Sequence, residues 1–262
     1  MVDFYSVFDG FEGQNFSGRL FEDIENLILK NYNKLPLSSL DKTSAYALTL
    51  LAKNNRKRYS INAKIKHFKA LNSIHYFLNS HILSLEKSKE EKLIKNKNQK
   101  VKKELRAYTV QDKLIFCDHF TRFYFYFLKP NEELILRGEF EEVLRRIRAQ
   151  FELYQSFCFE QLAREFLEKY FGVLRVESYW DRKIELDLYF RDEKLCFIGE
   201  VKFKNKKICK NILNQLHHKA KMLNLRPDYY IIFSKNGFSA ELEKMPKNQV
   251  LLFDLNDFAR LL

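Results

Sequence analysis

Two carboxylates and one lysine in the C-terminal part of the chain have types and spacing suited to phosphodiester chemistry. Asp187 lies within residues 184–188, and Glu200 and Lys202 lie within residues 199–203. Carboxylate oxygens are hard ligands for Mg²⁺, which polarises a scissile phosphate when bound. A nearby ammonium can orient the attacking water and offset charge on the phosphate. We therefore expect Asp187 and Glu200 to hold Mg²⁺ or Mn²⁺, with Lys202 as a further catalytic residue.

The alternation of side chains along strands can bring these residues together. Glu185 and Asp187 are two positions apart, so in a regular strand they share one face and Leu186 points to the other. Glu200 and Lys202 share a face by the same period. A hairpin would then gather the charged groups, with Glu185 in a supporting position. The alternative is an edge hairpin whose exposed charges form cross-strand ion pairs.

The flanking sequence predicts the elements that hold this hairpin. A helix with apolar residues from Phe159 to Tyr170 comes first, and Gly172 is expected to end it. After the predicted strands, an apolar stripe from Ile208 to Leu223 indicates another helix. The order is α-β-β-β-α-β, followed by one more strand and a short helix. The predicted strands are residues 173–180, 184–190, 195–203, 229–233 and 250–253.

This order and the two motifs resemble the PD-(D/E)XK superfamily of restriction-endonuclease-like nucleases. Its core is α-β-β-β-α-β, and its motif is an acidic residue followed by E-x-K. The resemblance covers roughly residues 151–233. It implies that Asp187 is the metal-binding acid, Glu200 the second acid and Lys202 the lysine. It also implies an auxiliary catalytic acid at Glu160, on the first helix.

Two polar residues follow on the helix after the E-x-K motif. Gln215 and Lys219 are four positions apart, so they lie on one helix face. Related enzymes contact the site from this helix, which makes both residues candidates for a supporting role. Exposure on a helix surface explains them as well.

The N-terminal part of the chain predicts a helical, winged-helix-like domain. Helices are expected from Thr43, from Ile61 with Ser60 as its cap, and over residues 71–82. A lysine-rich segment, residues 87–103, and a predicted strand, residues 105–110, would then form a basic wing. The alternative is an exposed loop within a helical domain. The candidate recognition helix contains no Arg, which weakens a role in reading DNA bases.

Aromatic residues are concentrated in residues 116–131. Such side chains could stack on nucleic-acid bases. A buried connecting helix is the favoured interpretation, because the segment has little polar surface. A charged helix over residues 133–148 should then lead to the C-terminal domain.

The composition fits a folded protein that attracts polyanions. Lys and Arg number 46 and Asp and Glu 34, which gives a net charge of +12. Nucleic acid is the commonest polyanionic partner, although an AT-rich coding sequence also enriches lysine. The four cysteines have no metal-binding spacing. With no apolar run long enough to span a bilayer and no signal sequence, a soluble cytoplasmic protein without a membrane partner is expected.

These observations predict a mixed α+β or α/β chain. We expect a winged-helix-like domain at residues 1–130, a connecting helix at residues 131–150 and a PD-(D/E)XK-like domain at residues 151–262. The same succession resembles the C-terminal region of archaeal-type P-loop ATPases. This sequence contains no GxxxxGK[ST] motif, so no ATP binding is expected.

The predicted function is a metal-dependent DNA endonuclease. One alternative is a catalytically silent module of the same fold that binds DNA or a partner, such as an ATPase. A second alternative is a DNA-binding regulator that uses only the winged-helix-like domain. Analogy with related nucleases, among which dimers are common, adds a homodimer to these alternatives.

Overall fold

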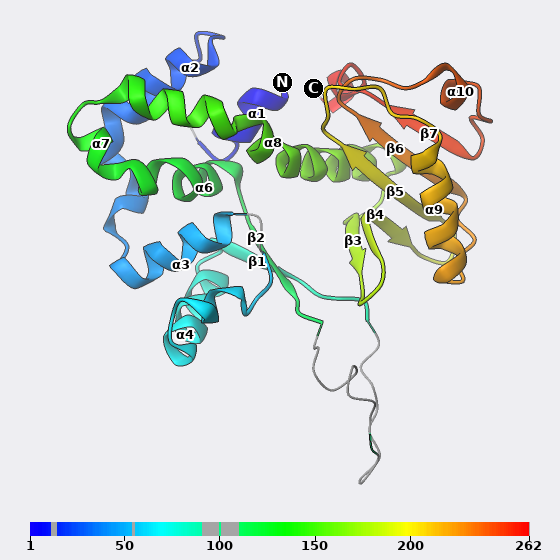
Figure 1. The fold of residues 1–262 in the computed structure, drawn as a ribbon, viewed down its shortest axis with the longest axis horizontal. Coiled ribbons are helices and arrows are strands. Elements are labelled where there is room, and N and C mark those ends of the chain that lie inside the picture. The colour runs from blue at the N-terminus through cyan, green and yellow to red at the C-terminus, as the bar shows by residue number, and fades with distance from the viewer. Residues whose placement is uncertain (12–14, 54–55, 91–99, 101–109, 262) are drawn as a thin grey trace. The chain divides into compact units, whose positions relative to one another are not determined.

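The structure is a computed structural model that describes residues 1–11, 15–53, 56–90, 100 and 110–261 (Figure 1). The chain divides into two compact units with mixed α and β structure. Unit 1 comprises Met1–Lys87 and Gln111–Gln155, and unit 2 comprises Ser88–Val110 and Ser156–Leu262. Among the described residues, no helix combines the length and apolar character needed to cross a bilayer.

Unit 1 is mainly helical, with one two-stranded antiparallel sheet formed by β1 and β2. The first and third predicted helices in its middle are present as α3 and α4, whereas the second is only the four-residue 3-10 turn η4. Ser60 is the first residue of this turn and Tyr59 its N-cap, so the cap predicted at Ser60 is wrong. Asp41 begins α3 by accepting hydrogen bonds from the backbone N–H groups of Thr43 and Ser44. The elements are α1 (Val2–Phe8), α2 (Leu20–Asp23), η1 (Ile24–Ile28), η2 (Leu29–Lys34), η3 (Pro36–Ser39), α3 (Lys42–Ala52), η4 (Ser60–Ala63), α4 (His67–Asn79), β1 (Leu83–Glu86), β2 (Lys113–Phe116), α6 (His119–Phe123), η5 (Tyr124–Leu128), η6 (Lys129–Asn131) and α7 (Glu132–Leu136).

Most of the predicted wing lies outside the described residues. Of the lysine-rich segment, the structure describes residues 87–90 and 100, and of the strand predicted at residues 105–110 it describes residue 110. The strands β1 and β2 lie on either side of this segment in the sequence and pair with each other, with Leu83 opposite Phe116. The described residues therefore show an antiparallel pair of strands after the helices.

The aromatic segment is buried within unit 1, as its composition predicted. Tyr124, Phe125 and Leu128 are fully buried. The helix expected there begins only at His119, after β2, and then runs without a gap through α6, the π-helical turn η5 and η6 to Asn131. Asp118 starts α6 by accepting hydrogen bonds from the N–H and hydroxyl of Thr121, so the helix cannot extend back through Phe116.

A continuous helix, α8 (Phe140–Phe171), replaces the separate helices expected on either side of residue 150. Gly138, at a φ of 77°, interrupts the predicted helix over residues 133–148 and separates α7 from α8. Gly172 follows the last turn at a φ of 65°, as predicted for a helix end. The division between the two units falls within α8, after Gln155.

Unit 2 contains a mixed five-stranded sheet with the order β3-β4-β5-β6-β7. The strand β4 is antiparallel to both of its neighbours, β3 and β5, whereas β5, β6 and β7 run parallel to one another. The helix α9 makes the connection that a parallel β5–β6 pair requires. The predicted α-β-β-β-α-β order is therefore confirmed. The elements after α8 are β3 (Glu177–Trp180), β4 (Glu185–Arg191), β5 (Cys196–Lys202), α9 (Asn211–Met222), β6 (Tyr229–Ser234), α10 (Ala240–Glu243), β7 (Val250–Phe253) and η7 (Asp257–Leu261).

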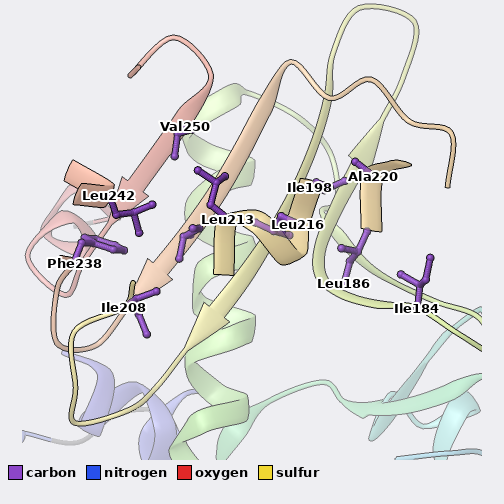
Figure 2. Packing of buried hydrophobic residues seen from close by; sticks show 11 residues of the cluster. Ile184, Leu186, Ile198, Ile208, Leu213, Leu216, Ala220, Phe238, Leu242 and Val250 are labelled. Atoms are coloured by element: carbon purple, nitrogen blue, oxygen red, sulfur yellow. The ribbon is translucent and has the colours of Figure 1, made fainter. Parts of the chain in front are cut away.

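The core of unit 2 lies on both faces of this sheet. Leu213, Leu216 and Ala220 of α9 pack in one cluster with Ile198 and Ile232 (Figure 2). Aromatic residues fill another part of the core, as side chains of α8 and η7 meet those of β6 and β7. The run of apolar residues in β6 reflects burial on both faces, which is typical of a parallel strand.

Candidate functional site

The strands β4 and β5 separate beside Asp187. Their last ladder pair is Leu188 opposite Gly199, and the same register continued would place Asp187 opposite Glu200. The Asp187 side chain fills the position of the missing ladder bond, because its Oδ2 accepts the backbone N–H of Val201 at 2.9 Å. The carboxylate of Asp187 is thus fixed against β5 at the point where the strands separate.

A β-bulge in β4 sets the direction of this part of the strand. Glu177 lies opposite Tyr189 and Tyr179 opposite Leu186, so β4 has one more residue than β3 between these pairs. The strict alternation predicted for this strand is therefore interrupted around Asp187. Leu186 packs in the apolar cluster beneath α9, which also contains Ile198. Bulges of this kind redirect side chains and are common beside functional sites.

Four charged side chains meet at this position, and we call them the four-residue cluster: Asp187, Glu200, Lys202 and Lys219. Lys202 contacts Glu200 at 2.5 Å and lies 3.6 Å from Asp187. Lys219 forms a second ion pair with Glu200. Its ammonium also donates to the backbone carbonyl of Glu185 at 2.7 Å. The cluster therefore joins β4, β5 and α9.

Burial and charge shift the ionisation of the cluster. Glu200 is only 5% exposed, and this burial, together with the charge of Asp187, raises its pKa above the usual value. The lysines act in the opposite direction but do not cancel the effect. Burial disfavours the charged form of Lys202, yet Asp187 and Glu200 outweigh it, and the pKa of Lys202 is raised. The cluster thus holds a carboxylate with a raised pKa beside a lysine whose pKa is raised as well.

The edge-hairpin alternative does not fit this sheet. Both β4 and β5 have neighbours on each side, since β3 pairs with β4 and β6 pairs with β5. Glu200 is buried rather than exposed. Its ion pairs therefore form within the unit, where water screens charges less than at a surface.

The other predicted site residues have different surroundings. Glu185 has an exposed side chain, and its backbone carbonyl accepts a hydrogen bond from Lys219. Gln215 is exposed one turn before Lys219 on α9. Glu160 forms a 2.5 Å ion pair with Arg164, one turn further along α8. The structure thus shows Lys219 in contact with Glu200 and places the carboxylate of Glu160 against an arginine of its own helix.

The donor set suits Mg²⁺ or Mn²⁺ better than a metal that needs a complete protein cage. Two carboxylates, those of Asp187 and Glu200, adjoin Lys202 in the cluster. The described part of the chain contains no group of three or more His, Cys, Asp or Glu side chains placed to hold a metal. Mg²⁺ commonly binds through one or two carboxylates and completes its shell with water and substrate phosphate.

A group of lysines adjoins the cluster that the site prediction did not include. Lys204, Lys206 and Lys207 follow β5 directly and are exposed. Lys235 follows β6, which is parallel to β5, so it lies at the same edge of the sheet. The backbone N–H of Lys235 donates to the carbonyl of Lys202. We call these four lysines the basic rim. The density of lysines just after the E-x-K motif was the available signal for Lys204, Lys206 and Lys207.

Comparisons with known proteins assign no activity. Residues 124–212 match a family described as "Archaea bacterial proteins of unknown function" (DUF234). An uncharacterized protein of Methanocaldococcus jannaschii is 34% identical over 156 residues, which cover 54% of this chain. The matched part covers 34% of the relative, so the chain spans about a third of its length. No solved structure matches.

Proposed function

We propose that unit 2 hydrolyses phosphodiester bonds of DNA as an endonuclease that needs Mg²⁺ or Mn²⁺. The observation that carries this proposal is the position of Asp187, fixed beside Glu200 and Lys202 where two central strands separate. The α-β-β-β-α-β order of unit 2 and its E-x-K motif also resemble the PD-(D/E)XK nucleases. Both the site and its surrounding elements therefore support the same chemistry.

The residues of the four-residue cluster have different proposed roles. Asp187 and Glu200 would hold the metal, which when bound polarises the scissile phosphate and acidifies water. Lys202 keeps its proton, so it can orient the attacking water and stabilise charge developing on the phosphate. Lys219 is a positioning residue, because it ties Glu200 to the backbone of β4. The basic rim would attract the phosphate backbone towards the cluster.

Unit 1 has a proposed supporting role in DNA binding. Its helices α3, η4 and α4 precede the paired strands β1 and β2, which is the order of a winged helix. The lysine-rich segment, which belongs to unit 2 from Ser88 onward, lies between these strands in the sequence and would add positive charge. A partner ATPase and a homodimer stay proposals of the same kind, as does a cytoplasmic location.

A second candidate function is a silent module of the same fold that binds DNA without cutting it. Two lysines engage the carboxylate of Glu200, and they compete with a metal for its oxygens. Such a module would keep the charge of the basic rim and therefore its affinity for DNA. It differs from the nuclease in having no metal-dependent reaction.

Cleavage of supercoiled plasmid DNA separates the two functions. The wild-type chain should nick or cut the plasmid with Mg²⁺ or Mn²⁺ and not with EDTA. Asp187→Asn should lower the rate at least about a hundredfold, in line with the loss of a group that stabilises a transition state. Glu193→Gln, in the exposed turn between β4 and β5, is the matched control. Equal cleavage by the wild type and Asp187→Asn would overturn the proposal.

A further inference from the structure

A pocket of about 510 Å³ lies within unit 2 beside the four-residue cluster. Tyr189, which lines it, follows Asp187 by two residues in β4, a separation of roughly 7 Å along a strand. Leu223, which also lines it, comes one turn after Lys219 of α9. The volume is within the range of about 300–1,000 Å³ found for sites that take small organic molecules. It can therefore admit a single nucleotide.

Two tyrosine rings line the pocket. The centroids of Tyr179 and Tyr189 are 5.5 Å apart, and the ring planes are inclined by 53°. The hydroxyl of Tyr179 donates to Asp181 Oδ2 at 3.0 Å. Asp181 in turn accepts the backbone N–H groups of Lys183 and Ile184, which fixes it in the turn. One tyrosine is thus anchored at its hydroxyl, and an aromatic face is the surface on which a nucleic-acid base stacks.

The charge of the pocket is positive. Its lining has four cationic side chains, Lys89, Arg182, Lys183 and Arg191, and two acidic ones, Glu90 and Asp181. Arg182 pairs with Glu90 at 2.8 Å, and Lys89 pairs with Glu177 nearby. Lys183 and Arg191 are exposed, and among the described residues no carboxylate lies within salt-bridge distance of either. These two cations are available to an anion such as phosphate.

We propose that this pocket binds an unpaired nucleotide of single-stranded DNA, with its base against the tyrosines and its phosphate near Lys183 and Arg191. A base within a duplex is stacked between its neighbours and cannot reach an aromatic side chain without being flipped out. The pocket therefore gives the site a preference for single-stranded or locally unpaired DNA. The effect of this preference on cleavage rests on the proposed function. The binding of single-stranded DNA to the pocket, however, can be measured without any cleavage.

The test is fluorescence anisotropy of the full chain with a labelled oligothymidylate of about 15 nucleotides, in EDTA. Tyr189→Leu keeps an apolar side chain and should weaken binding about tenfold, as expected when one base loses its stacking partner. Lys183→Glu with Arg191→Glu should weaken it further. Lys244→Glu with Lys247→Glu, at exposed sites that do not line the pocket, is the control of equal charge. The affinity for duplex DNA of the same length should change little in Tyr189→Leu.

Wild-type oligothymidylate affinity in Tyr189→Leu would overturn the inference, as would equal losses in the pocket and control charge variants. If a variant fails to fold, photo-crosslinking of the wild-type chain to single-stranded DNA that contains 5-iododeoxyuridine tests the inference instead. Crosslinks at Tyr179 or Tyr189 support the inference, and crosslinks confined to other residues overturn it. A chain that binds at the pocket but never cuts DNA contradicts only the proposed nuclease. A chain that cuts DNA while Tyr189→Leu binds normally contradicts only the pocket.

Discussion

Glu200 is a buried carboxylate whose oxygens take hydrogen bonds from two lysines, Lys202 and Lys219. Burying a carboxylate is unfavourable unless charged or polar groups compensate for the lost water. Here the compensation comes from β5 itself and from α9, so the ion pairs also join two elements. A metal placed between Glu200 and Asp187 would supply further positive charge to the same oxygens.

The raised pKa of Glu200 predicts a pH-dependent requirement for metal. The folded chain holds the Glu200 proton more tightly than an ordinary glutamate, whose pKa is 4.5. A proton on Glu200 excludes a cation, so the Mg²⁺ concentration for half-maximal DNA cleavage should rise as pH falls through the raised pKa. The rise should thus begin above the pH at which an ordinary glutamate becomes protonated. Cleavage rates measured against Mg²⁺ at a series of pH values provide the check.

The matched variant for this pH series is Glu200→Gln. It should show weak cleavage at every pH, because the amide cannot replace the carboxylate as a metal ligand. A wild-type Mg²⁺ requirement that stays constant down to the ordinary glutamate pKa would contradict the role assigned to Glu200.

At the scale of single residues, the sequence identified which residue types belong to the candidate site better than it identified their contacts. Residues two apart in a strand, such as Glu200 and Lys202, were predicted to act together, and they are in contact. Lys219 was only a supporting candidate, because a helix sequence does not show which of its polar residues meets the sheet. The burial of Glu200 also depends on tertiary packing that no local pattern contains.

Elements position the cluster through two features of the sheet, the bulge in β4 and Gly199 in β5. A Cβ atom added to Gly199 would lie 2.5 Å from the carbonyl oxygen of Ile231 and 2.9 Å from Leu188 Cδ1. The first of these atoms belongs to the backbone of β6, which cannot move without disturbing the sheet. Glycine at this position therefore lets β5 and β6 approach closely beside Glu200.

The substitution Gly199→Ala should disturb both stability and the site. Overpacking of this kind costs about 1–3 kcal/mol, so the thermal midpoint of unfolding should fall. Because Glu200 is the next residue, DNA cleavage should fall as well. Thermal denaturation and cleavage rates test the two effects. Lys194→Ala, in the exposed turn before β5, is the control, and an unchanged midpoint in Gly199→Ala would contradict the packing described here.

The sequence predicted the elements of unit 2 better than their irregularities. Helical spacing identified α9, and an apolar run identified β6, since both patterns reflect burial directly. The bulge arises from the pairing of β4 with β3, and the alternation within one strand does not reveal it. The continuity of α8 was missed because a change from charged to aromatic composition marks no helix end. Only Gly138 and Gly172, which adopt positive φ, interrupt the backbone there.

At the scale of the whole molecule, positive charge is the property most relevant to a nucleic-acid partner. The chain carries a net charge of +12, and three of its lysines follow β5 in the basic rim. Each lysine that neutralises a phosphate releases counterions, which makes binding depend on salt. The rim therefore links the overall charge to the position of the four-residue cluster.

Charge reversal in the basic rim should change this salt dependence. The triple variant Lys204→Glu, Lys206→Glu and Lys207→Glu should bind duplex DNA more weakly at low salt. The slope of log K against log salt should become shallower by up to about 3, because each lost phosphate contact removes about 0.9. Filter binding or anisotropy across salt concentrations measures the slope. The same slope in the triple variant as in the wild type would show that DNA binds elsewhere.

The central claim is that Asp187 and Glu200 together form a metal site, and Mn²⁺ binding followed by electron paramagnetic resonance tests it most directly. The full chain should remove Mn²⁺ from solution at one site that Asp187→Asn and Glu200→Gln both abolish. Glu193→Gln should bind as the wild type does. Equal Mn²⁺ binding by the wild type and Asp187→Asn, or no binding by the wild type, would contradict the account and leave the cluster as a set of buried ion pairs.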